Sequence, residues 1–118
     1  MLLDVEPETT LAKTVPYSPI FGEAHPGDGT ITILWGRPLS NGGEPITDYV
    51  VTPRRNGVRQ RPRTVRAVPN KDLYGIRLND LTNGDRYDFE VVAVNKLGAS
   101  TPARSAAATI GPQPDDGS

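Results

Sequence analysis

The sequence predicts an all-β fold in which seven strands form two antiparallel sheets packed face to face as a sandwich. Two observations support this fold class. Apolar and polar residues alternate over several short segments, which is the pattern of a strand with one buried face. The twelve glycines and twelve prolines of the 118-residue chain fall mostly between these segments and at the ends, where turns are expected. A chain of this length has room for one domain with its own core.

The N-terminal part is expected to be an arm followed by two strands. Residues 1–15 have no periodic apolar face, so we predict an extended acidic arm there. Its acidic residues are Asp4, Glu6 and Glu8. A first strand is expected around residues 20–24, followed by a Pro-Gly-Asp-Gly turn, and a second over residues 30–35. The residues of the second strand that are predicted to face inward are Ile31, Ile33 and Trp35.

The middle of the chain is predicted to form a hairpin. Residues 46–55 read as the third strand, and Asn56-Gly57 after them is the strongest hairpin signal in the sequence. A fourth strand is expected over residues 58–68. Pro62 places it at the edge of a sheet, because proline has no N–H to give to a second neighbour.

Three more strands complete the predicted sandwich. They are expected at residues 74–78, 86–95 and 106–110, and residues 112–118 are predicted to be a disordered acidic tail. The inward-facing residues expected in this part of the chain are Tyr74, Ile76, Leu78, Leu81, Tyr87, Phe89, Val91 and Ala93. Together with Trp35 and Tyr49 these aromatic and aliphatic side chains are predicted to be core rather than a ligand platform.

The most informative motif is the corner and strand between Leu81 and Gly98. The corner reads Leu81-x-x-Gly84-x-x-Tyr87, and Asn83-Gly84 allows a tight reversal because glycine tolerates positive φ. Tyr87, two residues into the strand, can bury its ring and turn its hydroxyl back onto the backbone of the corner. Such a tyrosine corner is typical of immunoglobulin-like sandwiches.

These residues resemble the fibronectin type III domain, a member of that superfold, in a variety that looks bacterial or phage-like. The segment TITILW at residues 30–35 resembles the family's second strand, which ends in a buried tryptophan. PITDYVV at residues 45–51 resembles its third strand, and NKLG at residues 95–98 the start of its F–G loop. The resemblance covers residues 16–111 and implies the fibronectin type III topology. It leaves function open, since this sandwich carries many roles. The predicted parts are the arm 1–15, the sandwich 16–111 and the tail 112–118.

One adhesive activity of this family is not expected here. Some members carry an integrin-binding Arg-Gly-Asp tripeptide in the F–G loop. The corresponding loop, residues 96–102, lacks it, and the tripeptide occurs nowhere in the chain. Leu97, near the tip of that loop, is expected to fold back on the sandwich rather than to form an exposed contact.

Composition excludes several further classes. The net charge of −1 predicts no general attraction to nucleic acid, and the absence of cysteine rules out disulfides and thiolate metal sites. No apolar stretch is long enough to span a membrane. The N-terminus lacks the basic and apolar segments of a secretory signal. We therefore expect no cofactor, no specific nucleic acid and no membrane insertion.

Catalysis is not expected either. The single histidine, His25, stands beside Pro26 in a predicted turn, and no cysteine offers a nucleophile. Asp80, Asp85 and Asp88 cluster near the corner. Aspartates in such places are usually solvated turn formers, so we predict no metal site there.

The unusual surface feature is a run of arginines without an intervening acid between Asp48 and Asp72. Its members are Arg54, Arg55, Arg59, Arg61, Arg63 and Arg66. On the predicted hairpin, three of them (59, 61 and 63) would project from one face as a row. That row could hold phosphate, sulfate or carboxylate groups of a polyanion, a cell-surface glycan or an acidic protein. It could instead protect an edge strand against aggregation. A third interpretation is that the acidic arm of one copy binds the arginine row of another.

Two functions from different classes follow. The first is a non-catalytic structural or binding protein of a phage virion, a capsid decoration or tail protein attached through its N-terminal arm. The Met1 start, the missing signal sequence and the arm favour it. The second is a spacer or adhesion module of a secreted bacterial carbohydrate-active enzyme or cell-surface protein, with the Pro-rich tail as the start of a linker. A module of an animal receptor or muscle protein is a third option. The expected location is a virion or an extracellular surface.

Overall fold

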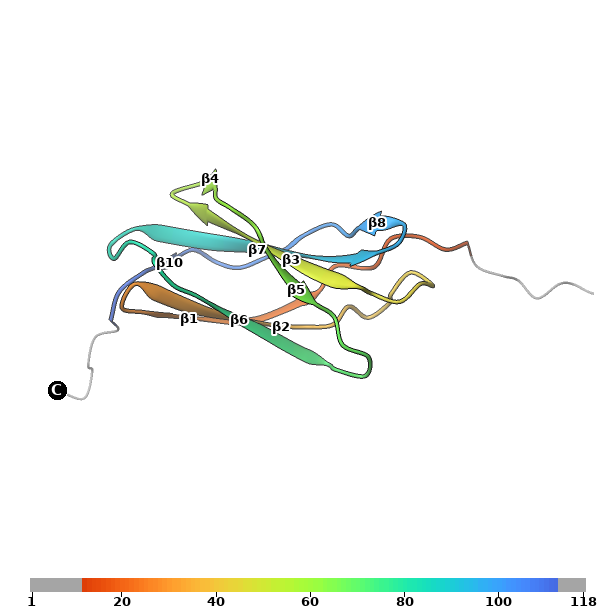
Figure 1. The fold of residues 1–118 in the computed structure, drawn as a ribbon. Coiled ribbons are helices and arrows are strands. Elements are labelled where there is room, and N and C mark those ends of the chain that lie inside the picture. Colours follow the sequence, from red (N-terminus) through yellow and green to blue (C-terminus); the bar gives the residue numbers. More distant parts are fainter. Residues whose placement is uncertain (1–11, 113–118) are drawn as a thin grey trace, which may run out of the picture.

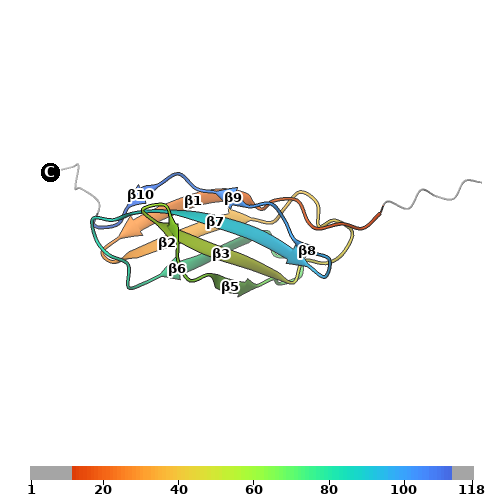
Figure 2. The same ribbon diagram turned by 90° about the horizontal axis from the view of Figure 1, so that it is seen from above.

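A computed structural model describes residues 12–112, which form ten strands in two layers and no helix (Figure 1). The first sheet has the order β1-β2-β6, with β1 (Ile20–Gly27), β2 (Thr30–Gly36) and β6 (Leu73–Leu78). The second has β7 (Arg86–Asn95) and β3 (Asp48–Arg55) side by side at its centre (Figure 2). Its edges are β4 (Val58–Arg59) and β5 (Arg63–Arg66) on one side, and β8 (Gly98–Ala99), β9 (Ala103–Arg104) and β10 (Ala108–Thr109) on the other. The predicted antiparallel two-sheet sandwich is confirmed.

The first strand is longer than predicted and its turn is shorter. β1 continues to Gly27, which pairs with Thr30, so only two residues remain in the turn. Pro26 is tolerated inside β1 because this strand lies at the edge of its sheet. His25 is therefore a strand residue and not a turn residue, which corrects the prediction.

The predicted fourth strand is wrong as a continuous element. The chain pairs with β3 through β4, leaves the sheet over residues 60–62, and returns as β5. Pro62 lies in this gap. Its ring removes an N–H and restricts the residue before it, so the break falls where proline is most disruptive.

The hairpin before that break forms as expected. Asn56 and Gly57 have φ values of 50° and 87°, as a two-residue type I′ turn requires, and Arg55 pairs with Val58 across it. Of the last predicted strand, residues 106–110, only the two-residue β10 forms, and the chain before it pairs with β7 through two further short strands that were not predicted, β8 and β9. Counting β4 with β5, and β8 with β9 and β10, the ten strands follow seven strand paths.

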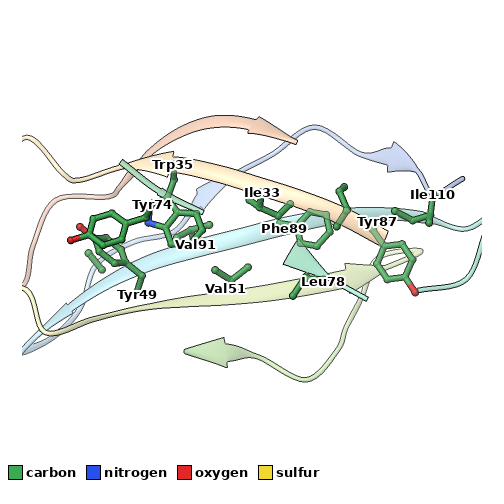
Figure 3. Packing of buried hydrophobic residues seen from close by; sticks show 12 residues of the cluster. Ile33, Trp35, Tyr49, Val51, Tyr74, Leu78, Tyr87, Phe89, Val91 and Ile110 are labelled. Atoms are coloured by element: carbon green, nitrogen blue, oxygen red, sulfur yellow. The ribbon is translucent and has the colours of Figure 1, made fainter. Parts of the chain in front are cut away.

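The core lies between the two sheets (Figure 3). Its buried members are Ile31, Ile33, Trp35, Tyr49, Val51, Tyr74, Leu78, Tyr87, Phe89, Val91, Ala93 and Ile110, and Ile76 and Leu81 are partly buried against them. Strand alternation places most of these residues inward, as the sequence pattern predicts. Val51 and Ile110 are core residues that were not predicted, and Ile110 lies just after β10. Each large side chain stabilises the fold by about 1.5–3 kcal/mol. Trp35, Tyr49 and Tyr74 form one aromatic group, with ring centroids 4.6–6.1 Å apart.

The prediction for Tyr87 is confirmed for its buried ring and is wrong for its hydroxyl. Its ring is buried and stacks on Phe89 with a centroid distance of 6.3 Å. Its hydroxyl, however, makes no hydrogen bond to any residue from 12 to 112, and it lies at the end of the core away from the tryptophan (Figure 3). The corner is closed by backbone instead: Gly84 N–H donates to the Ile110 carbonyl at 2.8 Å, and Ile110 N–H donates to that of Asp85 at 3.0 Å.

Candidate binding surfaces

The arginine run lies along the β3–β4–β5 edge of the second sheet, but most of its charge is neutralised. Arg54 makes a two-pronged ion pair with Asp88 on β7, with Nε–Oδ1 and Nη2–Oδ2 distances of 2.7 and 2.9 Å. These hydrogen bonds lower the pKa of the Asp88 carboxyl and raise the pKa of the Arg54 guanidinium. The pair is half-buried and joins the two central strands.

A second acid, Glu90, is held between two arginines from opposite sides of β7. Arg59 on β4 lies 3.0 Å from its Oε1, and Arg104 on β9 lies 2.8 Å from its Oε2. The glutamate side chain is only 6% exposed, so both contacts act where water screens them least. Arg55 is bonded to Asp85 in the corner, and Arg66 lies more loosely 3.9 Å from Asp48.

Arg61 and Arg63 are the members of the run without an acidic partner among residues 12–112. Arg63 donates to the carbonyl of Arg61 at 2.6 Å; Arg61 lies in the gap between β4 and β5, and Arg63 is the first residue of β5. The predicted continuous row of residues 59, 61 and 63 is therefore wrong, because Arg59 is turned to Glu90 and the strand is interrupted after it. That the arginine run binds a polyanion, a glycan or an acidic protein stays a prediction.

Sequence reasoning missed the acids that neutralise the run. No acid separates these arginines in the sequence, but β7 lies next to β3 and presents Asp88 and Glu90 on its outer face. The signal was present in the alternation of β7: the residues between inward-facing Tyr87, Phe89 and Val91 had to face outward. Arg77 on β6 is a further arginine with no acid beside it in the described part of the chain.

A different surface forms at the end of the sandwich where the chain enters it. The segment 13–18 crosses the loop between β2 and β3 and the turn after β7. Thr14 N–H donates to the carbonyl of Gly42 at 2.9 Å, and Asn95 Nδ2 donates to the carbonyls of Thr14 and Asn41 at 2.8 and 2.9 Å. Ser18 Oγ donates to the Thr101 carbonyl at 2.8 Å. The entering segment is thus fastened to both loops.

One acid binds the same three segments together. Glu44 lies 2.7 Å from the amine of Lys13 in the entering segment and 3.6 Å from that of Lys96 after β7. The hydrogen bond from Lys13 lowers the pKa of Glu44 against the opposing effect of desolvation. The predicted acidic residues of the arm, Asp4, Glu6 and Glu8, and the tail from residue 113 onward lie outside the described residues.

No catalytic or metal-binding arrangement is found within residues 12–112. His25 is exposed and its Nε2 lies 2.6 Å from Oε1 of Glu23, with no nucleophile in the contact. No group of three or more histidine or acidic residues in this range could hold a metal ion, and Asp85 and Asp88 are occupied by arginines. No helix long and apolar enough to cross a membrane is present there either. Leu97 remains 47% exposed, so the expectation that it folds back is wrong.

The fold and these surfaces define a β-sandwich module whose polar surface side chains serve mainly to hold its own strands and loops together. The family model of the fibronectin type III domain matches residues 23–109, and the chain belongs to this family. Domains of this family are in general non-catalytic modules for structure and protein binding.

Solved structures support the same fold. The twitchin kinase region from C. elegans superimposes with a TM-score of 0.71 and 24% identity over 83% of this chain and 17% of that one. Titin domains A168–A170 match with a TM-score of 0.62 and 25% identity, over 82% of this chain and 32% of the titin chain. The protein FN3tt mut gives a TM-score of 0.62 and 22% identity, over 83% of this chain and 99% of that protein's chain. The chain spans less than a third of the twitchin and titin chains, and the kinase in the twitchin name is a statement about that protein.

Proposed function

We propose that this fibronectin type III domain is a structural module which is fixed to a larger assembly from its N-terminal side. We further propose that the arginines along the β3–β4–β5 edge, the arginine edge, face a protein partner. The observation that carries the proposal is the anchoring of residues 13–18 to both loops by backbone and side-chain hydrogen bonds. A flexible entry would leave the sandwich free to turn. A fastened entry sets the direction in which the domain points from whatever precedes it.

The assembly we propose is a phage virion, in which the domain is a capsid decoration or a tail component. The acidic residues Asp4, Glu6 and Glu8 stand directly before the anchored segment, and we propose that they attach to a neighbouring copy or to a capsid or tail protein. The guanidinium groups of Arg61 and Arg63, which have no acidic partner among residues 12–112, suit such an acidic segment, since a guanidinium can hold a carboxylate with two hydrogen bonds.

The arginine contact is tested by mixing the protein with a peptide of residues 1–11 and measuring binding by fluorescence anisotropy. We expect binding that weakens as salt is raised and is lost in the double variant Arg61→Glu/Arg63→Glu. Arg86→Glu is the matched control, because Arg86 is also exposed and without an acidic partner in the described part of the chain. Equal binding by the wild-type protein and the double variant would remove this role.

The assembly is tested on native source material by labelling with an antibody against the sandwich and viewing by electron microscopy. Label on particles supports the virion role. Label on the cell surface, or recovery of the domain within a secreted carbohydrate-active enzyme, supports the alternative spacer or adhesion role. That alternative is favoured by the Pro-Gln-Pro-Asp-Asp sequence near the C-terminus, which is typical of a linker.

A further inference from the structure

The outer face of the three-stranded sheet carries large apolar side chains in the open. Inward residues of β1, β2 and β6 fill the core, so their neighbours in sequence point to the other side. On that side Ile20, Leu34 and Leu73 are 49%, 38% and 74% exposed. Figure 1 shows β1, β2 and β6 as an outer layer with no described strand on its far side.

Glycines make this face flat. Gly36 stands between Ile20 and Leu73 in the strand register, and Leu34 is paired with Gly75. Leu34 lies over Gly75 so closely that a Cβ there would be 2.7 Å from its Cδ2. Glycine within a strand costs stability, and it often marks a site where another backbone or a ligand approaches closely. A flat apolar sheet face is the kind of surface against which a second sheet packs.

The apolar surface continues over the adjoining loops. Leu39 and Val68, 84% and 49% exposed, line the same hollow as Leu34 and Leu73, and Tyr17 lines the hollow next to it. Within residues 12–112, three of the eight exposed large apolar residues thus lie on this sheet face, and three more line the hollows beside it. The other two, Val58 and Leu97, belong to the second sheet and its turn. Apolar residues gathered in this way mark an interaction site, whereas isolated ones do not.

The charges that border the face suit a second copy of the same face. Glu23 lies on β1 at one edge of the sheet, and Arg77 lies on β6 at the other, with no acid beside it in the described chain. A twofold axis parallel to the strands places β1 of each copy over β6 of the other. Glu23 pairs with Leu34, and both His25 and Arg77 pair with Thr32, so Glu23 is displaced from the level of Arg77 by two residues, about 7 Å along the strand. An arginine side chain spans that offset. Glu23 contacts His25 through Oε1, which leaves its Oε2 for the arginine.

We propose that two copies of this chain pack the outer faces of β1, β2 and β6 against each other, with Leu34 and Leu73 at the centre. Glu23 of each copy then pairs with Arg77 of the second copy. The central contacts of this dimer come from β1, β2 and β6 and use neither the arginine edge nor residues 1–11, so the dimer can be tested independently of the proposed function.

The test is sedimentation equilibrium of the full chain. We expect a dimer whose dissociation constant rises by about tenfold or more in Leu73→Asp. Val58→Asp is the matched control, because Val58 is 63% exposed on the other sheet, and it should dimerise like the wild type. A wild-type chain that stays monomeric up to about 1 mM overturns the proposal.

A charge exchange tests the orientation. Glu23→Arg and Arg77→Glu should each weaken the dimer, because like charges then face each other. The double variant Glu23→Arg/Arg77→Glu should restore it. A double variant as weak as the single ones, or a dimer unaffected by Leu73→Asp, overturns the proposal.

Discussion

Gly42 and Thr14 lie in direct backbone contact at the end of the sandwich where the chain enters. Thr14 N–H donates to the Gly42 carbonyl at 2.9 Å, and a Cβ on Gly42 would overlap the carbonyl oxygen of Thr14. Gly42 also has a φ of 79°, in the region that favours glycine. The loop between β2 and β3 is therefore shaped to receive the entering segment, and a side chain at this position would expel it.

Substitution of Gly42 by alanine should release the entering segment. Alanine at this position must adopt a positive φ that disfavours it, and its Cβ takes the space of the Thr14 carbonyl. We therefore expect a loss of about 2–4 kcal/mol in the free energy of unfolding, measured in urea. Gly57→Ala is the control. Its φ of 87° is similar, but no heavy atom lies within 4 Å of the added Cβ, so only the backbone strain remains. Equal losses in the two variants would contradict the tight contact with Thr14.

Asn95 should be needed for the same end of the domain. Its amide donates to the carbonyls of Thr14 and Asn41, and its oxygen accepts from the Leu97 N–H at 2.8 Å. Asn95→Ala leaves these groups without a partner in a largely buried place, at a cost of about 1–3 kcal/mol. Asn95→Asp keeps the acceptor but sets a carboxylate against two carbonyl oxygens, so we expect it to destabilise as well. Wild-type stability of the aspartate variant in a thermal melt would contradict this account.

The ion pair between Arg54 and Asp88 should make the stability of the fold decrease at acidic pH. The pKa of Asp88 is lowered from its usual 3.8 in the folded protein. A carboxyl whose pKa is lowered in the folded state contributes its full stability when the pH is above the pKa of the unfolded chain. That contribution is lost as the pH falls from the unfolded pKa through the folded pKa. We expect the melting temperature to fall below about pH 5, and Asp88→Asn to reduce that slope. Asp72→Asn is the control for loss of an ion pair, because the Arg37–Asp72 pair is 59% and 70% exposed and is screened by water, so we expect its loss to cost less stability at neutral pH.

Tyr49 should link stability to alkaline pH. Burial raises the pKa of its hydroxyl from 10.0 to about 12, with a smaller contribution from neighbouring Tyr74. A raised pKa in the folded state gives stability that is complete below the unfolded value and is lost as the pH rises towards 12. An ultraviolet titration should show a tyrosine ionisation step near pH 12. The variant Tyr49→Phe should remove that step and should flatten the alkaline loss of stability.

Alternation and turn chemistry were sufficient for the fold. The inward set in β2 and β7 follows from the strict period of two, because one buried face allows only one register. The turn at Asn56-Gly57 follows from the need for positive φ at both residues. These are local constraints, so they can be read from neighbouring residues. The broken strand at Pro62 was less accessible, since proline is compatible both with an edge strand and with a gap in it.

The amino-acid sequence by itself determined that this chain is a fibronectin type III sandwich, which faces its strands bury, and where its tightest hairpin lies. The tertiary structure alone decided which charges are free. Arg54 and Arg59 are neutralised by Asp88 and Glu90, more than thirty residues away along the chain, because β7 pairs with β3. It also decided where the entering segment lies and that most of the exposed large apolar residues of the described chain lie on one sheet face or line the hollows beside it. Such pairings depend on which strands become neighbours, and no local pattern in the sequence records that.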